Sequence, residues 1–142
     1  MKVNEIMTEN PAYAVIGTSL REVAQMMSEH DCGCLPVIEN EEDKKPIGVI
    51  TDRDITIRTV SHGKDPLNMV AGEVMTDNVV TINADANLED CVTAMEKNQI
   101  RRVVVVDEAG NLCGMIAQAD IARSASVKET AELVKDVSVS AN

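Results

Sequence analysis

The chain contains two copies of one sequence pattern, and this repeat restricts the possible folds more than any other feature. The segment VNEIMTEN near the start aligns with AGEVMTDN, which places Met7 on Met75 at an offset of 68 residues. After the charged, proline-containing segment EEDKKP the offset drops to 66, which aligns Asp54 with Asp120. An insertion in such a loop costs little free energy. Similarity over nearly the whole chain therefore predicts two copies of one structural unit.

Each copy shows the element order strand, helix, strand, strand, helix. In the first copy Ser19 and Glu22 have the spacing of a capping box, which predicts a helix start. The other elements of that copy are predicted at residues 13–16, 35–38, 47–50 and 52–61. In the second copy we predict strands at 79–82, 102–107 and 112–116, a helix capped by Asn87 and a helix from about Gln118. The predicted boundaries are 1–66 for repeat 1, 67–125 for repeat 2 and 126–142 for a C-terminal helix or tail.

The composition indicates an aliphatic core. Hydrophobic residues make up 44% of the 142, but the chain has no Trp, no Phe and one Tyr, so Val, Ile, Leu, Ala and eight Met must fill the interior. A unit of roughly 60 residues buries little surface alone. We therefore expect an α/β (α+β) fold in which two β-α-β-β-α units pack through their sheets with pseudo-twofold symmetry. Such packing creates two equivalent clefts.

The net charge of −11, from 24 acidic and 13 basic residues, argues against two classes of partner. A field of that sign repels phosphate backbones and anionic lipid, so neither nucleic acid nor a membrane is expected as a partner. No apolar run approaches the ~20 residues that span a bilayer, and the start MKVNEIMTEN lacks the apolar region of a signal peptide. A cytoplasmic location is the default. A small anion can still bind where local Arg side chains and backbone N–H groups outweigh the global charge.

The four cysteines and the missing catalytic motifs limit the chemistry. Cys32 and Cys34 form C-x-C, while Cys91 and Cys113 stand alone, so the paired short spacings of a zinc site are absent. Buried structural thiols are the favoured interpretation, and no metal ligand is assigned. A redox or metal sensor at Cys32 and Cys34 is a weaker hypothesis. Because the sequence also lacks G-x-S-x-G, a Gly-rich phosphate loop and H-E-x-x-H, we predict no enzyme activity.

Two long motifs carry a resemblance to a known family. The segments CLPVIENEEDKKPIGVITDRDI and RRVVVVDEAGNLCGMIAQADI resemble the second halves of two CBS motifs: Pro-Val, an acidic residue, a loop, then Gly, two apolar residues and Thr-x-x-Asp. EIMT and EVMT resemble the start of the same motif. The second copy departs from the pattern, with Val104 in place of Pro and Ala117 in place of Thr. The chain thus resembles, over residues 3–125, a stand-alone tandem CBS pair, also called a Bateman module.

The resemblance implies a function as well as a fold. Many CBS pairs dimerise into flat disks and bind adenosine-containing ligands such as AMP, ADP, ATP or S-adenosylmethionine, thereby regulating another protein. Other members bind no nucleotide. The resemblance therefore implies a ligand sensor that needs no cofactor, forms a homodimer and acts on an unidentified regulated protein. The alternative is an interaction module with empty clefts that dimerises or docks on a partner.

The resemblance also implies two clefts, each combining the Thr-x-x-Asp of one repeat with early segments of the other. Site A would contain Thr51, Arg53, Asp54, Thr76, Val80, Ile100, Arg101 and Arg102. Site B, the weaker of the two, would contain Thr8, Ala12, Cys32, Gly33, Cys34, Ala117 and Asp120. Site A keeps the Thr and two adjacent Arg, whereas site B keeps the Asp but has no basic residue in its 32–34 segment.

Physical chemistry supports this assignment and also offers simpler explanations. An Asp in the first turn of a helix can accept two ribose hydroxyls, and Arg can fork onto phosphate oxygens. Asp54 can equally serve only to offset the helix dipole, and Thr51 can serve only as an N-cap. Arg101 and Arg102 can pair with surface acids. Arg53 and Arg58 are predicted to be helix-face charges, with Arg58 at the rim of the cleft.

Overall fold

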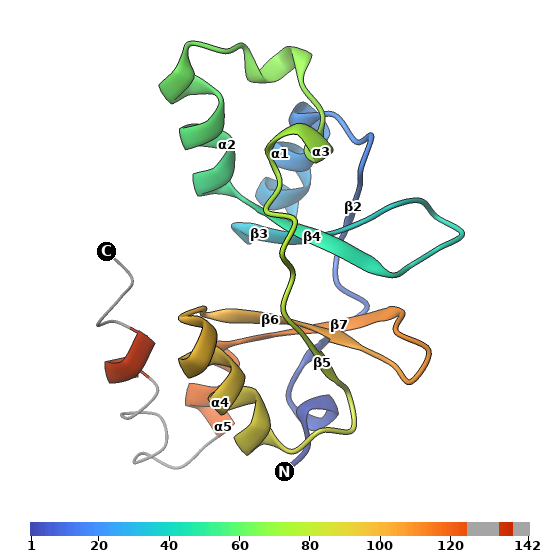
Figure 1. Cartoon of the computed structure of the whole chain (residues 1–142), viewed down its shortest axis with the longest axis vertical. Helices are drawn as coiled ribbons and strands as arrows, with labels where there is room; N and C mark the ends of the chain where they lie inside the picture. Colours follow the sequence, from blue (N-terminus) through green and yellow to red (C-terminus); the bar gives the residue numbers. More distant parts are fainter. Residues whose placement is uncertain (125–133, 138–142) are drawn as a thin grey trace. The chain divides into compact units, whose positions relative to one another are not determined.

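The structure is a computed structural model that describes residues 1–124 and 134–137. Its internal contacts divide the chain into two compact units: unit 1 comprises Met1–Asn10 and Val80–Asn142, and unit 2 comprises Pro11–Val79 (Figure 1). The units do not follow the predicted repeat boundaries, because residues 1–10 join the second repeat and residues 67–79 join the first. Burial gives the reason: Val3 is 0% exposed in the core of unit 1, and Val74 is 1% exposed in the core of unit 2.

Unit 2 has a three-stranded sheet in the order β2-β3-β4, with β2 and β3 parallel and β3 and β4 antiparallel. Two longer helices and three short helical turns accompany the sheet. The elements are β2 (Ala14–Val15), α1 (Leu20–Glu29), β3 (Cys34–Ile38), β4 (Pro46–Thr51), α2 (Asp52–Arg58), η2 (Val60–His62), η3 (Pro66–Asn68) and α3 (Ala71–Val74).

Helix α1 begins where the sequence predicts. The Ser19 side chain accepts a hydrogen bond from the backbone N–H of Glu22 at 3.2 Å, which satisfies one of the unpaired donors of the first turn. Helix α2 is shorter than the predicted 52–61. It ends at Arg58, and the chain continues as the 3-10 turn η2 up to Gly63, whose φ of +70° suits glycine.

Unit 1 has a four-stranded sheet in the order β1-β7-β6-β5. Strands β5 and β6 are parallel, and β7 runs antiparallel to both β6 and β1. The elements are η1 (Val3–Glu5), β1 (Thr8–Glu9), β5 (Thr81–Asn83), α4 (Leu88–Asn98), β6 (Arg102–Val106), β7 (Leu112–Ala117) and α5 (Gln118–Ser124). Both units thus show the predicted β-α-β-β-α order in an α+β fold. The packing of one sheet on the other stays a prediction.

Two further predictions concern unit 1. Asn87 occupies the N-cap position of α4, as predicted, but its side chain forms no capping hydrogen bond. Within the predicted C-terminal segment 126–142, residues 134–137 are helical and Val137 is buried in the core of unit 1. The remainder of that segment lies outside the described residues. No helix within 1–124 and 134–137 is long and apolar enough to cross a membrane.

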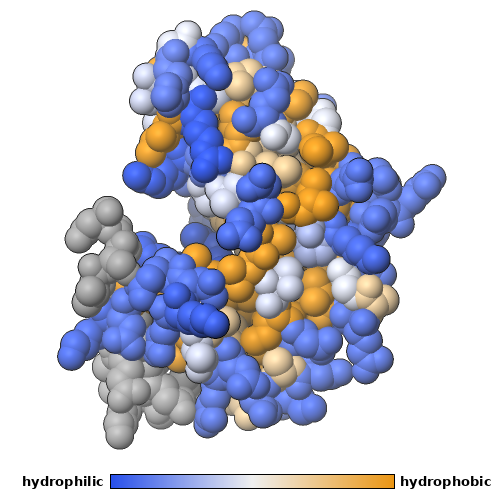
Figure 2. Space-filling model, in the orientation of Figure 1, coloured by the Kyte–Doolittle hydropathy of each residue, from blue (hydrophilic) through white to orange (hydrophobic). Residues whose placement is uncertain are grey.

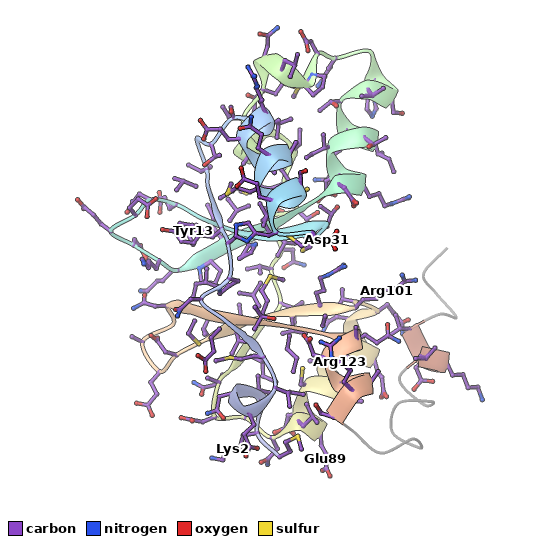
Figure 3. All side chains as sticks on the ribbon, turned by 180° about the vertical axis from the view of Figure 1, so that it is seen from behind. Lys2, Tyr13, Asp31, Glu89, Arg101 and Arg123 are labelled. Atoms are coloured by element: carbon purple, nitrogen blue, oxygen red, sulfur yellow. The ribbon has the colours of Figure 1, made fainter. Side chains whose placement is uncertain are left out.

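The loop between β3 and β4 gathers hydrophilic residues, which appear blue at the right-hand edge of unit 2 in Figure 2. Asn40 begins it, because its side-chain oxygen accepts from the N–H groups of Glu42 and Asp43 at 2.9 and 2.7 Å. The Tyr13 hydroxyl donates to Glu41, and this hydrogen bond raises the pKa of Tyr13 (Figure 3). The insertion that changes the repeat offset therefore forms a solvated turn.

Candidate functional site

The Thr-x-x-Asp motif of unit 2 lies where β4 ends and α2 begins. Thr51 is the N-cap of α2, and its hydroxyl accepts from the N–H of Asp54 at 3.0 Å. The Asp54 carboxylate reaches back and accepts from the N–H of Thr51, also at 3.0 Å. These reciprocal bonds form a capping box. The interpretation of Thr51 as an N-cap is thus confirmed, and the same bonds fix the Asp54 carboxylate in one orientation.

Thr76 lies beside that carboxylate. Its hydroxyl is 3.4 and 3.5 Å from the two oxygens of Asp54, and its backbone exchanges hydrogen bonds of 2.8 and 2.9 Å with Val49 on β4. The Asp54 side chain is 15% exposed, so most of its surface is covered by protein atoms. Unit 2 therefore brings together three of the residues assigned to site A: Thr51, Asp54 and Thr76.

Arg58 completes this group, whereas the sequence analysis predicted it only as a helix-face charge at the rim of the cleft. It lies four residues after Asp54 on α2, and its guanidinium is 3.9 Å from the carboxylate. One guanidinium nitrogen also donates to the backbone carbonyls of Val74 and Met75 at 2.9 and 2.7 Å. Arg58 is thus more than a helix-face charge. The i,i+4 spacing to Asp54 is the signal in the sequence that indicates this pair.

Unit 1 repeats the helix start with different side chains. The Asp120 carboxylate accepts from the N–H of Ala117 at 2.8 Å, which is the backbone half of the capping box seen in unit 2. Ala117 has no hydroxyl to return the bond. Asp120 forms an ion pair with Arg123 on α5, whose side chain is 71% exposed (Figure 3). Thr8 pairs with Met115 across β1 and β7, as Thr76 pairs with Val49 in unit 2.

Two of the three basic residues predicted for site A, Arg101 and Arg102, belong to unit 1. Arg102 is the cross-strand neighbour of Ala117, and the carbonyl of Arg101 accepts from the N–H of Gln118 at 2.8 Å. Both Arg side chains are exposed. They therefore lie next to the helix start that carries Asp120, whereas their predicted partners Thr51 and Asp54 belong to unit 2.

The corresponding segment of unit 2 is compact. Cys34 is the cross-strand neighbour of Thr51, and the carbonyl of Gly33 accepts from the N–H of Asp52 at 3.0 Å. A Cβ atom at Gly33 would lie 2.8 Å from a carboxylate oxygen of Asp52, so a larger residue there would have to displace that exposed side chain. Each unit thus carries one part of each predicted site. The joining of these parts into sites A and B stays a prediction.

The remaining predicted residues divide into packed and exposed ones. Val80 and Ile100 are partly buried against the core of unit 1. Ala12 and Cys32 are partly buried against the core of unit 2. Arg53 is exposed on α2, and its backbone N–H donates to Asp52 at 2.8 Å.

The four cysteines are thiols. Burial raises the pKa of Cys91 to about 12. It also raises the pKa of Cys113, with smaller contributions from the charges of Asp107 and Asp85. Within residues 1–124 and 134–137, no three side chains of His, Cys, Asp or Glu lie close enough together to hold a metal ion. The hypothesis of a metal sensor at Cys32 and Cys34 therefore gains no support from the described residues.

The pattern of two similar units with Thr/Ala-x-x-Asp helix starts agrees with a comparison against protein families. The CBS domain family matches twice, at residues 3–59 and 71–127. The chain belongs to the CBS domain family. The two matches in tandem confirm the predicted CBS pair, and its α+β fold is shared by solved CBS-pair structures.

Relatives of this CBS pair include a curated protein and several solved structures. Hypoxic response protein 1 of Mycobacterium tuberculosis is 37% identical over 119 residues, covering 84% of this chain and 81% of that protein. A crystal structure of Hypoxic Response Protein I with two coordinated zinc ions has a TM-score of 0.78 and 33% identity, and the match covers 89% of this chain and 100% of that one.

Two similar structures contain adenosine derivatives. CBSX2, from Arabidopsis thaliana, in complex with AMP has a TM-score of 0.71 and 26% identity, covering 87% of this chain and 95% of that one. The CBS pair of protein MJ0100, in complex with 5′-methylthioadenosine and S-adenosyl-L-methionine, has a TM-score of 0.75 and 29% identity, covering 87% and 98%. Ligand binding by CBS pairs of this fold is therefore established for those proteins.

Proposed function

We propose that this CBS pair is a regulatory module that binds an adenosine-containing ligand of the AMP, ADP or ATP class. Binding would use the helix start of α2 and require no catalysis. The observation that carries the proposal is the polar group around Asp54, in which Thr51 orients a carboxylate that is 15% exposed and Thr76 lies beside it. Because a carboxylate accepts hydrogen bonds only, it suits the two hydroxyls of a ribose.

The complexes of CBSX2 with AMP and of the MJ0100 pair with S-adenosyl-L-methionine support the ligand class. In our proposal the ribose lies against Asp54, and Arg101 and Arg102 supply phosphate contacts in site A, in the arrangement that the family resemblance implies. Site B, with Ala117 in place of Thr51, would bind more weakly. The module would act in the cytoplasm as a homodimer and regulate a separate protein.

The second candidate is an interaction module whose clefts stay empty. It is favoured by large apolar side chains that unit 2 leaves exposed after α2: Val60 is 62% exposed and Leu67 is 68% exposed. Leu67 also borders a shallow groove between α1 and α2 that includes Leu20, Ala24, Ile55 and Pro66. An apolar surface of this kind suits a second copy of the chain or a partner protein.

A thermal-shift titration separates the two candidates. The protein would be melted with AMP, ADP, ATP or S-adenosylmethionine, as wild type, Asp54→Ala and Asp120→Ala. A ligand at 100 times its dissociation constant adds about 2.7 kcal/mol to the free energy of unfolding. We expect this shift for the wild type, its loss in Asp54→Ala and a much smaller effect of Asp120→Ala.

Asp120→Ala is the matched control, because both substitutions remove a carboxylate that caps a helix start. Equal loss of the ligand shift in both variants would refute the proposed asymmetry between the sites. No shift with any of the four ligands would refute the sensor and leave the interaction module. That module would then be tested by its oligomeric state before and after Leu67→Glu.

A further inference from the structure

Arg58 makes more polar contacts than a solvent-exposed charge on a helix face needs. One guanidinium nitrogen donates to two consecutive backbone carbonyls, those of Val74 and Met75, at 2.9 and 2.7 Å. Carbonyls at the end of a helix lack partners within the helix, and α3 ends at Val74. A basic side chain that caps them holds the end of that helix in place. Arg58 therefore fastens the segment after α3 to α2.

The other guanidinium nitrogen of Arg58 faces the candidate ligand group. It is 3.4 Å from the Thr76 hydroxyl and 3.9 Å from the Asp54 carboxylate. A single planar guanidinium thus contacts the residue proposed to bind ribose and the three residues Val74–Thr76. Lys cannot reproduce this arrangement, because its ammonium is a point charge without the rigid fork of Arg.

Strand β4 holds the same segment from its other side. Thr76 exchanges two backbone hydrogen bonds with Val49, and a Cβ atom on Gly48 would lie 2.6 Å from the Thr76 carbonyl oxygen. In addition to this pairing, the Arg58 contact at 3.4 Å restrains the Thr76 hydroxyl beside Asp54. After Thr76 the chain needs only residues 77–79 before it enters unit 1 at Val80.

The described residues of unit 1 show no equivalent connection. Its basic residue Arg123 lies three positions after Asp120, forms an ion pair with that carboxylate and is 71% exposed. Ile6 and Met7 correspond to Val74 and Met75 at the offset of 68. Within residues 1–124 and 134–137 their carbonyls accept no hydrogen bond from a side chain. The chain thus contains an internal control for the role of Arg58.

We propose that Arg58 is a positioning residue of the ligand site, and that it couples a ligand on Asp54 to the Val74–Thr76 segment. This inference rests on the proposed function. A ribose hydroxyl that donates to Asp54 joins the contacts that Thr76 and Arg58 already make with this carboxylate, and so strengthens the hold on the segment leading into unit 1. Without the Arg58 guanidinium, Thr76 and Asp54 are less ordered before the ligand arrives. The free-energy cost of ordering them on binding then lowers the affinity.

The first test is calorimetric titration of AMP, ADP, ATP and S-adenosylmethionine into wild type, Arg58→Gln, Arg58→Lys and Arg123→Gln. We expect Arg58→Gln and Arg58→Lys to weaken binding about tenfold, as for loss of hydrogen bonds from a charged donor. Arg123→Gln should change affinity by less than about twofold, as for an exposed ion pair. Melting without ligand shows that each variant is folded.

The second test measures coupling rather than affinity alone. In the wild type, ligand should alter hydrogen exchange at the backbone N–H groups of Val49 and Thr76, each of which donates to the carbonyl of the other residue. In Arg58→Gln that ligand-dependent change should disappear. Combining Arg58→Gln with Thr76→Val should weaken binding by less than the sum of the two single changes, because both act through one contact.

The outcomes distinguish this inference from the function on which it rests. No binding of any ligand by the wild type overturns the proposed function, and this inference with it. Wild-type affinity in Arg58→Gln overturns the inference alone. Wild-type affinity in Arg58→Lys, with weak binding in Arg58→Gln, shows that positive charge suffices and also overturns the positioning role.

Discussion

The starts of α2 and α5 are equivalent positions in two units of one chain, and they differ in the side chains that surround one shared aspartate. Asp54 and Asp120 have nearly equal side-chain exposure, at 15% and 14%. Each carboxylate accepts from the backbone N–H three residues earlier, at 3.0 and 2.8 Å. The aspartate is therefore explained by helix capping in both units. What differs is its surroundings: Thr51, Thr76 and Arg58 in one unit, Ala117 and an exposed Arg123 in the other.

A second difference concerns the apolar surface. The core of unit 1 includes Val137 from the helical residues 134–137 near the end of the chain. Among the described residues, the core of unit 2 includes none from the C-terminal segment, and after α2 this unit leaves Val60 and Leu67 exposed. The unit with the richer polar group thus also carries this exposed apolar pair. Ligand binding and partner docking can both be sought in unit 2.

The largest expected effect on stability comes from adding a methyl group at the two equivalent glycines, Gly48 on β4 and Gly114 on β7. In Gly48→Ala the new Cβ would lie 2.6 Å from the backbone oxygen of Thr76, which cannot move without breaking its pairing with Val49. In Gly114→Ala the closest atom, at 2.5 Å, is the sulfur of Met7, a flexible side chain. We expect the first to cost about 3 kcal/mol and the second about 1 kcal/mol.

Urea unfolding of both glycine variants measures these costs. An equal loss of stability would show that the Val74–Thr76 segment is no more firmly held than residues 6–8 of unit 1. That result would remove one support for a fixed Thr76 beside Asp54.

The next effect compares apolar residues of the two units. Val137→Ala removes two methyl groups from a side chain that is 1% exposed, so we expect a loss of about 2 kcal/mol. Leu67→Ala changes a side chain that is 68% exposed, and we expect a change within about 0.5 kcal/mol. Both are read from denaturant midpoints at low protein concentration. A large cost for Leu67→Ala that grows with protein concentration would indicate that Leu67 is covered by a second copy.

A smaller effect is expected when the side chains at the starts of α2 and α5 are exchanged. Thr51→Ala removes the hydroxyl that accepts from the Asp54 N–H, and we expect a loss of about 1 kcal/mol. Ala117→Thr supplies the missing hydroxyl to α5, and we expect a gain of similar size. Thermal melts without ligand measure both. If Ala117→Thr also created ligand binding at site B, the Thr rather than Arg58 would be the deciding difference between the units.

The order of elements could be predicted from the repeat, because periodicity and turn residues act locally. Ser19 and Gly48 illustrate this: the cap of α1 and the second strand of the hairpin lie where the pattern indicates. The exchange of leading segments between the units could not be predicted in this way. It depends on where Val3 and Val74 are buried, and burial is a long-range property that alignment offsets do not contain.

The candidate site was predictable in part. Thr51, Asp54 and Thr76 were assigned from the motif, and the structure places them together. Arg58 was predicted only as a helix-face charge at the rim of the cleft, because its two carbonyl partners lie 16 and 17 residues away along the chain. A backbone carbonyl has no residue-specific signal, so only the tertiary structure shows that contact. Asn87 occupies the predicted N-cap of α4 without a side-chain hydrogen bond, since the residue type permits such a bond without requiring it.

The smallest expected effect compares the cores of the two units and is a dependence of stability on pH. Cys91 in unit 1 corresponds to Val23 in unit 2 at the offset of 68, and both are 0% exposed. Burial raises the pKa of Cys91 from 9.0 to about 12. Between these values the unfolded chain releases the thiol proton while the folded chain keeps it, so stability is complete below pH 9 and falls as the pH rises. At pH 9.5 this one thiol should remove about 0.8 kcal/mol from the free energy of unfolding.

Cys91→Val places at this position the residue type of Val23 in unit 2, and it should remove the part of the alkaline loss of stability that comes from the Cys91 thiol. Val23→Cys is the reciprocal variant, and it should add a loss of similar size because the position is equally buried. Urea unfolding at pH 7.5 and pH 9.5 measures both changes in each protein. If the alkaline loss of stability were unchanged in Cys91→Val, other titrating groups would cause it. Cys113 would be the first of these, because burial and the charge of Asp107 also raise its pKa. A matching pair of changes would show that the two cores treat a buried thiol alike, so that the units differ mainly at their helix starts and exposed apolar surfaces.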